Sequence, residues 1–205
     1  EMKEMVDQKK WKEFLREIPI KKGDFFQINP GCLHAIKGGT VILETQQSSD
    51  VTYRVYDYDR LQNGVPRELH LEDSKAVIKA PFSPVASERK VMKTENVEIE
   101  HFIKCSKYSV ERYVVDGEWR HNFRADFTNV TVTEGNGTID GEKIKKGDSF
   151  IVPKGCGALK LSGEFEIICS WAECGKQENQ VGYCITVEDW MGRKKAQIKN
   201  EEQGI

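Results

Sequence analysis

The chain lacks any apolar segment of the length that a membrane-spanning helix needs. Its longest apolar runs are short pieces such as residues 40–43 and 150–153, against the roughly 20 residues that cross a bilayer. It also lacks an excess of charge of either sign, because the net charge is −2 and the pI is about 6.2. This balance predicts no broad basic surface for nucleic acid or an anionic membrane. Residues 1–17 are charged throughout and contain no apolar core of a signal peptide, so we expect a cytoplasmic protein.

The cysteines do not form the pattern of a disulfide framework or of a cysteine-rich metal site. No two of them make a C-x-x-C pair, and the spacing from Cys169 to Cys174 does not suit a zinc knuckle. A chain of 205 residues is also long for a disulfide scaffold. We expect six reduced thiols, packed mostly in sheets: Cys32, Cys105, Cys156, Cys169, Cys174 and Cys184.

The most informative segment is residues 22–60, in which a strand pattern leads into a sharp turn. Phe26 and Ile28 alternate with polar residues, as in a half-buried strand. Pro30-Gly31 then interrupts the pattern, and glycine readily adopts the positive φ that a tight reversal often requires. Because His34 follows this turn, we expect its imidazole at the mouth of the space that the sheet encloses, where a metal ligand would be placed.

The same turn occurs twice along the chain. KKGDFF at residues 21–26 reappears as KKGDSF at residues 145–150, and Gly-Cys at 31–32 reappears at 155–156 in the same gap-free register. We therefore predict two copies of one β supersecondary unit. In this register His34 is matched by Ala158, so the first copy keeps an imidazole where the second has a methyl group. We predict that the first copy contributes to a reactive site and that the second copy has only a structural role.

Glycine-rich turns divide most of the chain into short strands, which favours an antiparallel sandwich or barrel. Residues 1–17 place apolar side chains at helical spacing and predict an amphipathic helix that ends at Pro19. We predict a second short helix at 69–77, a linker at 79–88, turns at 63–64, 134–137 and 140–141, and strands at 24–28, 40–46, 51–58, 98–106, 109–115, 129–133, 150–152, 164–170 and 183–187.

His34 is the candidate metal ligand, and the alternative is an ordinary histidine in a surface turn. A neutral imidazole suits zinc, but a catalytic zinc requires about three protein ligands and an open position. The sequence therefore supplies one ligand and an incomplete site, because the remaining histidines show no ligand spacing to it: His70, His101 and His121.

Arg54 and Glu44 are the other candidates. Arg54 lies among aromatic residues in a predicted strand, where an arginine needs an anionic partner. That partner is either a phosphate or developing oxyanion of a substrate, or Asp57 or Asp59 in a structural ion pair. Glu44, between apolar residues, is a candidate for proton transfer and equally a salt-bridge partner for Arg54.

A family resemblance covers these residues. KKGDFFQINPGCLHAI at 21–36, LETQQSSDVTYRVYDYDR at 43–60 and RELHL at 67–71 resemble type I mannose-6-phosphate isomerases, particularly the shorter bacterial form. These are zinc enzymes of the cupin superfamily. The match covers residues 1–84 well and residues 98–170 more loosely. It implies a mostly β protein with two cupin-like antiparallel β-barrel (jelly-roll) units and a short N-terminal helix.

The resemblance also implies roles for residues and parts of the chain. His34 would be one zinc ligand, Arg54 the active-site arginine, and Glu44 a residue lining the substrate pocket. The family's other zinc ligands, a Gln-x-His pair and a glutamate, lie on strands before the helical region, and this sequence has no such strands. Because the chain opens inside a helical pattern, we expect a C-terminal portion of the enzyme. Its implied parts are a helical segment (1–20), an incomplete catalytic cupin unit with a linker (21–88), a second, degenerate cupin unit (89–175) and a tail (176–205).

The implied reaction is the interconversion of mannose 6-phosphate and fructose 6-phosphate through a cis-enediol, with zinc as cofactor. The implied partners are the phosphorylated hexose and the N-terminal portion of the same enzyme, so we expect this chain alone to be inactive. A rival interpretation is a non-catalytic bicupin that binds sugar or serves a structural role, since a fold by itself does not decide function.

Overall fold

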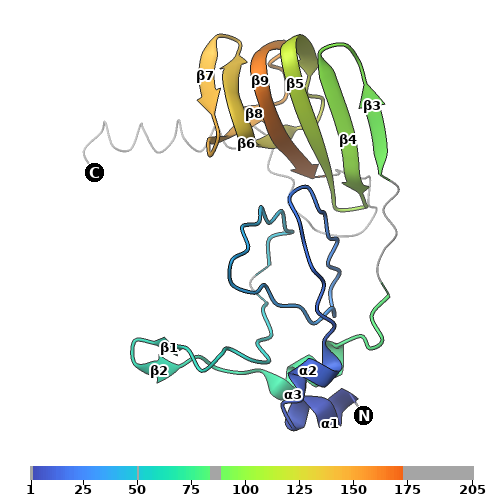
Figure 1. Ribbon diagram of the computed structural model, residues 1–205, viewed down its shortest axis with the longest axis vertical. Coiled ribbons are helices and arrows are strands. Elements are labelled where there is room, and N and C mark those ends of the chain that lie inside the picture. The colour runs from blue at the N-terminus through green and yellow to red at the C-terminus, as the bar shows by residue number, and fades with distance from the viewer. Residues whose placement is uncertain (1, 50, 84–88, 173–205) are drawn as a thin grey trace, which may run out of the picture. The chain divides into compact units, whose positions relative to one another are not determined.

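The computed structural model describes residues 2–49, 51–83 and 89–172 (Figure 1). The chain divides into two compact units, residues 1–86 (unit 1) and residues 87–205 (unit 2). The predicted strand at 183–187, the predicted tail, Cys174 and Cys184 lie outside the described residues.

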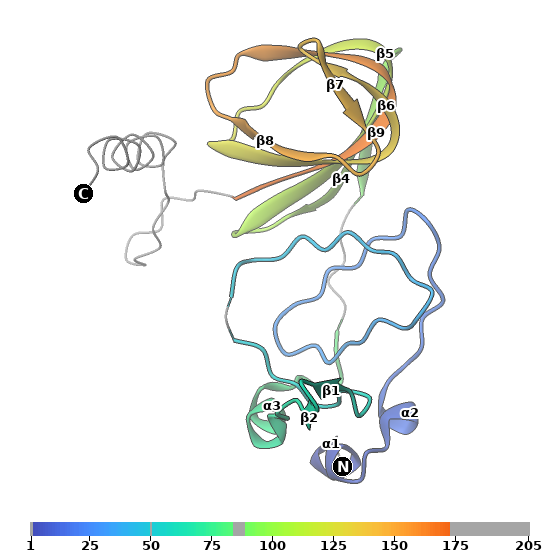
Figure 2. The ribbon, with the colours of Figure 1, turned by 90° about the vertical axis from the view of Figure 1, so that its left-hand side faces the viewer.

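Unit 2 is one antiparallel sheet that curls into a barrel (Figure 2). Its strand order is β3-β4-β5-β9-β6-β7, and β8 pairs with β6. Five of its strands match predicted ones, while β3 and β7 were not predicted. The strands are β3 (Lys90–Lys93), β4 (Val97–Lys104), β5 (Tyr108–Asn122), β6 (Phe127–Ile139), β7 (Glu142–Lys145), β8 (Ser149–Pro153) and β9 (Ala158–Ala172).

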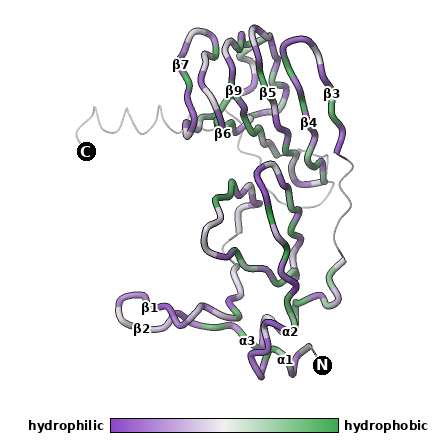
Figure 3. Tube along the Cα trace, in the orientation of Figure 1, coloured by the Kyte–Doolittle hydropathy of each residue, from purple (hydrophilic) through white to green (hydrophobic). Residues whose placement is uncertain are grey.

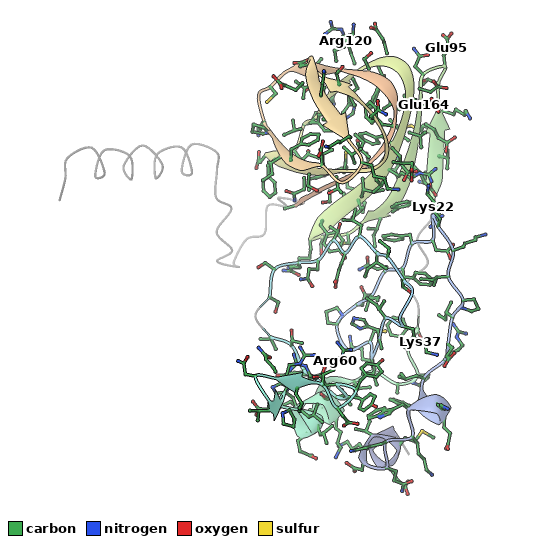
Figure 4. The ribbon with its side chains drawn as sticks, turned by 60° about the vertical axis from the view of Figure 1, so that its left-hand side comes forward. Lys22, Lys37, Arg60, Glu95, Arg120 and Glu164 are labelled. Atoms are coloured by element: carbon green, nitrogen blue, oxygen red, sulfur yellow. The ribbon has the colours of Figure 1, made fainter. Side chains whose placement is uncertain are left out.

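The barrel core comes from alternate residues of its long strands. Hydrophobic and hydrophilic residues alternate along these strands (Figure 3), and side chains fill the space inside the curl (Figure 4). Successive side chains of a strand point to opposite faces, so every second residue is buried. The core members that are at most 3% exposed are Tyr113, Val115, Val130, Val132, Leu161, Phe165, Ile167 and Cys169.

Three glycines on neighbouring strands allow the long strands to approach closely. Gly163 of β9 is paired with Gly117 of β5 on one side and with Gly137 of β6 on the other. A Cβ on Gly163 would lie 2.7 Å from the Cα of Gly137. The turn predicted at 134–137 is therefore wrong: β6 continues through it, and its glycines serve close packing rather than reversal. The turn predicted at Asp140-Gly141 is confirmed, because it joins β6 to β7.

A buried carboxylate inside the barrel is fully partnered. The Tyr113 hydroxyl donates to Glu111 Oε2 at 2.6 Å, and His101 Nδ1 lies 2.5 Å from Glu111 Oε1. Buried charges need such partners. His101 and Glu111 are also directly opposite in the β4–β5 ladder, so His101 is a structural partner of Glu111.

His121 makes the stability of unit 2 depend on pH. Its ring lies between those of Trp119 and Phe123, with centroids 4.5 Å from each. Burial, with a smaller contribution from Arg124, lowers the pKa of His121 from 6.5 to about 4. The unfolded chain therefore binds this proton at a higher pH than the folded chain does. The stability that depends on neutral His121 is complete above pH 6.5 and is lost as the pH falls towards about 4.

We expect the free energy of unfolding of unit 2 to fall more between pH 7 and pH 4.5 in the unchanged chain than in a His121→Leu variant. The difference should be about 1 kcal/mol, since the ring is partly exposed and solvent screens the effect. Urea titrations of both chains at both pH values measure it. Equal pH slopes would contradict the assignment.

The described residues of unit 1 form three short helices and one hairpin: α1 (Met2–Asp7), α2 (Trp11–Phe14), α3 (Leu71–Val77), β1 (Leu61–Gln62) and β2 (Val65–Pro66). The predicted helix at 69–77 is confirmed as α3, and the turn at Asn63-Gly64 joins β1 to β2. The single helix predicted over residues 1–17 is wrong. It is interrupted between α1 and α2, where Lys9 adopts a φ of 55° that a continuing right-handed helix excludes.

The strands predicted at 24–28, 40–46 and 51–58 are not formed in the described residues. A strand requires a neighbouring strand whose backbone groups form a ladder with it, and no β-ladder includes these segments in the described part of the chain. Apolar residues occur along these segments (Figure 3), and many of their side chains are exposed. Examples are Phe26, Val41, Ile42, Leu43 and Val51, which are 48–99% exposed.

Two predictions from composition can be compared with the structure. No helix in the described ranges is long and apolar enough to cross a membrane. The four cysteines in those ranges are free thiols, as predicted: Cys32, Cys105, Cys156 and Cys169. The prediction that they pack mostly in sheets is wrong, because of these four only Cys169 lies in a strand.

Candidate active site

The two predicted copies of the repeat form the same turn. In the first copy, Lys21 N–H donates to Asp24 Oδ2 at 2.9 Å and Asp24 N–H donates to Lys21 O at 3.1 Å. In the second, the corresponding distances for Lys145 and Asp148 are 2.9 and 3.0 Å. The glycine before each aspartate has a φ of +88° or +93°. Residues 21–24 therefore repeat the geometry of the turn that joins β7 to β8.

The turn that precedes His34 forms as predicted. Cys32 N–H donates to Asn29 O at 3.1 Å, and Gly31 has a φ of +88°. In the second copy the residue that matches His34, Ala158, is the first residue of β9. The side chain of Ala158 therefore lies at the start of a strand of the barrel.

His34 is exposed, and its ring is oriented by the backbone. Nδ1 lies 3.0 Å from the carbonyl oxygen of Cys32. When Nδ1 donates to that carbonyl, Nε2 carries the free lone pair that a metal requires. His34 therefore fits the role of one zinc ligand. No group of three or more histidine, cysteine, aspartate or glutamate side chains that could hold a metal occurs in the described residues.

Arg54 is half-buried beside a second arginine and its carboxylate. Its Nη1 donates to Glu68 O at 3.3 Å, and its Nε lies 4.0 Å from Asp57 Oδ1. Asp57 accepts hydrogen bonds on both oxygens from Arg67, at 2.6 Å for the Nε–Oδ2 pair. The hydrogen bond from Arg67 holds the pKa of Asp57 below its usual range. The structural ion pair of Asp57 is thus made mainly with Arg67, and Arg54 lies at the edge of it.

Glu44 is exposed in a segment without regular secondary structure. No hydrogen bond or ion pair joins it to Arg54 or to His34 in the described part of unit 1. The roles predicted for these three residues stay predictions.

Two further features were not predicted from the sequence. Both backbone polar groups of Arg54 are bonded to His70, a histidine whose spacing in the sequence predicts no role in the site. An open cavity of about 350 Å³ is lined by Lys37, Arg60, Tyr58, Ile36 and Gly38; Figure 4 labels its two cationic residues. Lys37 and Arg60 are far apart in the sequence, with Glu44 and Arg54 between them. Their shared cavity is therefore seen only in the folded chain.

Comparisons with known proteins give consistent results for both units. Residues 98–172 match the family model described as "Mannose-6-phosphate isomerase, cupin domain". The chain is 40% identical over 178 residues to mannose-6-phosphate isomerase ManA of Bacillus subtilis, covering 83% of this chain and 56% of that protein. It is 34% identical over 180 residues to a mannose-6-phosphate isomerase of Streptococcus mutans, covering 85% and 57%.

A solved structure extends the likeness to the fold. The crystal structure of the mannose 6-phosphate isomerase from Bacillus subtilis superposes with a TM-score of 0.80 at 35% identity, covering 83% of this chain and 56% of that one. This chain is mostly β with few helices and has a cupin-like fold. It spans a little more than half the length of the relatives it matches. Residues 98–172 thus match the cupin domain of mannose-6-phosphate isomerases, and most of this chain is similar in sequence and fold to proteins of that name.

Proposed function

We propose that this chain supplies part of the active site of an isomerase that interconverts mannose 6-phosphate and fructose 6-phosphate. The observation that carries the proposal is the similarity to proteins named as mannose-6-phosphate isomerases, which runs through both units rather than through the barrel alone. The reaction moves a proton between neighbouring carbons through a cis-enediol. Four free cysteines support a reducing, cytoplasmic location.

The partner in this proposal is the N-terminal portion of the enzyme, which completes a second barrel around unit 1. Apolar side chains of residues 24–28 and 40–46 are exposed, and no β-ladder includes either segment in the described ranges. Strands added along these segments would bury that surface. The turn at residues 21–24 supports this arrangement, because its counterpart in unit 2 joins two strands, β7 and β8, of the curled sheet.

Zinc is the proposed cofactor, with His34 as the ligand from this chain and the remaining ligands from the N-terminal portion. When bound, zinc acts as a Lewis acid that polarises the oxygens of the substrate. His34 Nε2 suits this role because the Cys32 carbonyl occupies Nδ1. A segment with one ligand should bind zinc weakly by itself.

In a complex of this chain with the N-terminal portion of the Bacillus subtilis relative, His34→Ala should lower zinc affinity about a hundredfold. Zinc titration with a chromophoric chelator as competitor measures this. His121→Leu is the matched control, since that histidine lies inside the barrel of unit 2 and should leave zinc affinity unchanged. Equal affinity of the His34→Ala and unchanged complexes would refute the ligand assignment.

The phosphate and the enediolate need separate cationic partners. Lys37 and Arg60 border one open cavity. Lys37 Nζ lies 2.6 Å from Glu17 Oε1, so Arg60 is the cation of this cavity that we assign to the phosphate group. Arg54 is then the guanidinium left to stabilise the enediolate. Glu44 is proposed to line the pocket, and the residue that moves the proton is not assigned.

The second candidate function is that of a non-catalytic bicupin. The barrel of unit 2 favours it, because that barrel is filled by side chains and its copy of the repeat has Ala158 in place of the histidine. His34 and Arg54 favour the enzyme, since a scaffold needs neither.

A further inference from the structure

Helix α3 is joined at its N-terminal end to Arg54. His70, which directly precedes the helix, donates its N–H to Arg54 O at 2.8 Å. In return Arg54 N–H donates to His70 Nδ1 at 3.1 Å. Both backbone polar groups of Arg54 are therefore bound by one residue, and His70 Nδ1 must be unprotonated to accept.

The C-terminal end of α3 is joined to the turn that precedes His34. Lys79 N–H donates to Gly31 O at 2.9 Å. A Cβ on Gly31 would lie 2.7 Å from Val77 O, so only glycine allows this approach. Gly31 is three residues before His34 in the sequence.

The helix between these two ends is well anchored. Ser74 is 1% exposed, and the helix itself is continuous from His70 to Ile78, with bonds of 2.9 Å from Ser74 N–H to His70 O and from Ile78 N–H to Ser74 O. Lys75 makes ion pairs with Asp7 of α1 and with Glu72. Seven helical residues span about 10 Å at about 1.5 Å per residue, a fixed length.

We propose that α3 is a strut that fixes the separation between Arg54 and the turn before His34, with His70 and Gly31 as positioning residues. The proposal rests on the proposed function for the roles of His34 and Arg54. It assigns to His70 a task other than metal binding or proton transfer. The imidazole acts on the reaction through the backbone of Arg54 and touches no reacting atom.

Amide hydrogen exchange in the full chain tests the strut without substrate. In a His70→Ala variant, exchange at the Arg54 amide should become about tenfold faster, because the acceptor is lost. His70→Asn should restore the original rate, since its Oδ1 occupies the place of Nδ1. Exchange in unit 2, for example at Val132, should be the same in all three chains. An unchanged exchange rate of the Arg54 amide in His70→Ala would overturn the strut. An exchange rate in His70→Asn as fast as that in His70→Ala would overturn it as well.

The role of the strut in the reaction is tested by the turnover of a complex between this chain and the N-terminal portion of the Bacillus subtilis relative. His70→Ala should lower kcat about tenfold with little change in KM or zinc content, and His70→Asn should recover most of the loss. A kcat unaffected by His70→Ala would overturn the positioning role. A complex of the unchanged chain that shows no turnover would refute the proposed function instead, and amide exchange would then decide on the strut alone.

Discussion

Replacing Arg54 by alanine should lower kcat of the complex between this chain and the N-terminal portion of the enzyme by about 10²–10³, the usual loss when one donor to a developing oxyanion is removed. The guanidinium is half-buried and keeps one bond to the Glu68 carbonyl, so it is placed before the substrate arrives. A spectrophotometric assay that couples fructose 6-phosphate to a reporter enzyme measures kcat and KM.

Variants of two other arginines show whether the effect is specific to Arg54. Arg60→Ala removes a cation from the cavity that we assign to the phosphate, and it should raise KM with a smaller effect on kcat. Arg120→Gln changes an exposed arginine of β5 and should alter neither constant. If Arg54→Ala raised KM alone and left kcat unchanged, Arg54 would hold the phosphate and the assignment of the two cationic sites would be reversed.

Replacing Gly137 by alanine should destabilise the barrel of unit 2 by about 3 kcal/mol. The added Cβ would lie 2.4 Å from Ser162 O and 2.6 Å from a carbon of the Phe165 ring. The backbone of β9 cannot move away, because it is paired on both edges with β5 and β6. Urea unfolding followed by tryptophan fluorescence measures the loss, since Trp119 and Trp171 pack against this core.

Gly141→Ala is the matched control for that variant. Gly141 has a φ of +87° with no atom within 4 Å of an added Cβ, so its cost is that of backbone strain alone, about 1–2 kcal/mol. Equal losses for the two variants would show that close packing of β6 on β9 is not what requires Gly137.

The strands of unit 2 could be predicted from alternation because their partners are in the same chain. The predicted strands 98–106 and 150–152 correspond to β4 and β8 within two residues. The predictions at 109–115, 129–133 and 164–170 are too short, because β5, β6 and β9 extend well beyond them. The glycines at 135 and 137 were misinterpreted, because a glycine cluster marks a tight turn and a close approach of two strands equally well. Only the positions of the neighbouring strands distinguish these cases.

The strands of unit 1 could not be predicted correctly for a different reason. Residues 24–28 and 40–46 have the pattern of strands, but alternation describes the side chains and not the hydrogen-bonding partner that a strand requires. The candidate site shows the same limit. The turn before His34 is local and forms as predicted, whereas the bonds between His70 and Arg54 join residues distant in sequence, and no spacing rule announces them.

Isomerase turnover by this chain with zinc, measured with and without the N-terminal portion of the Bacillus subtilis relative, tests most directly whether the site is shared between two stretches of polypeptide. We predict no turnover by either part alone and clear turnover by the two together. Turnover by this chain alone would contradict the shared site, and an inactive mixture in which the two parts demonstrably bind would contradict the isomerase function.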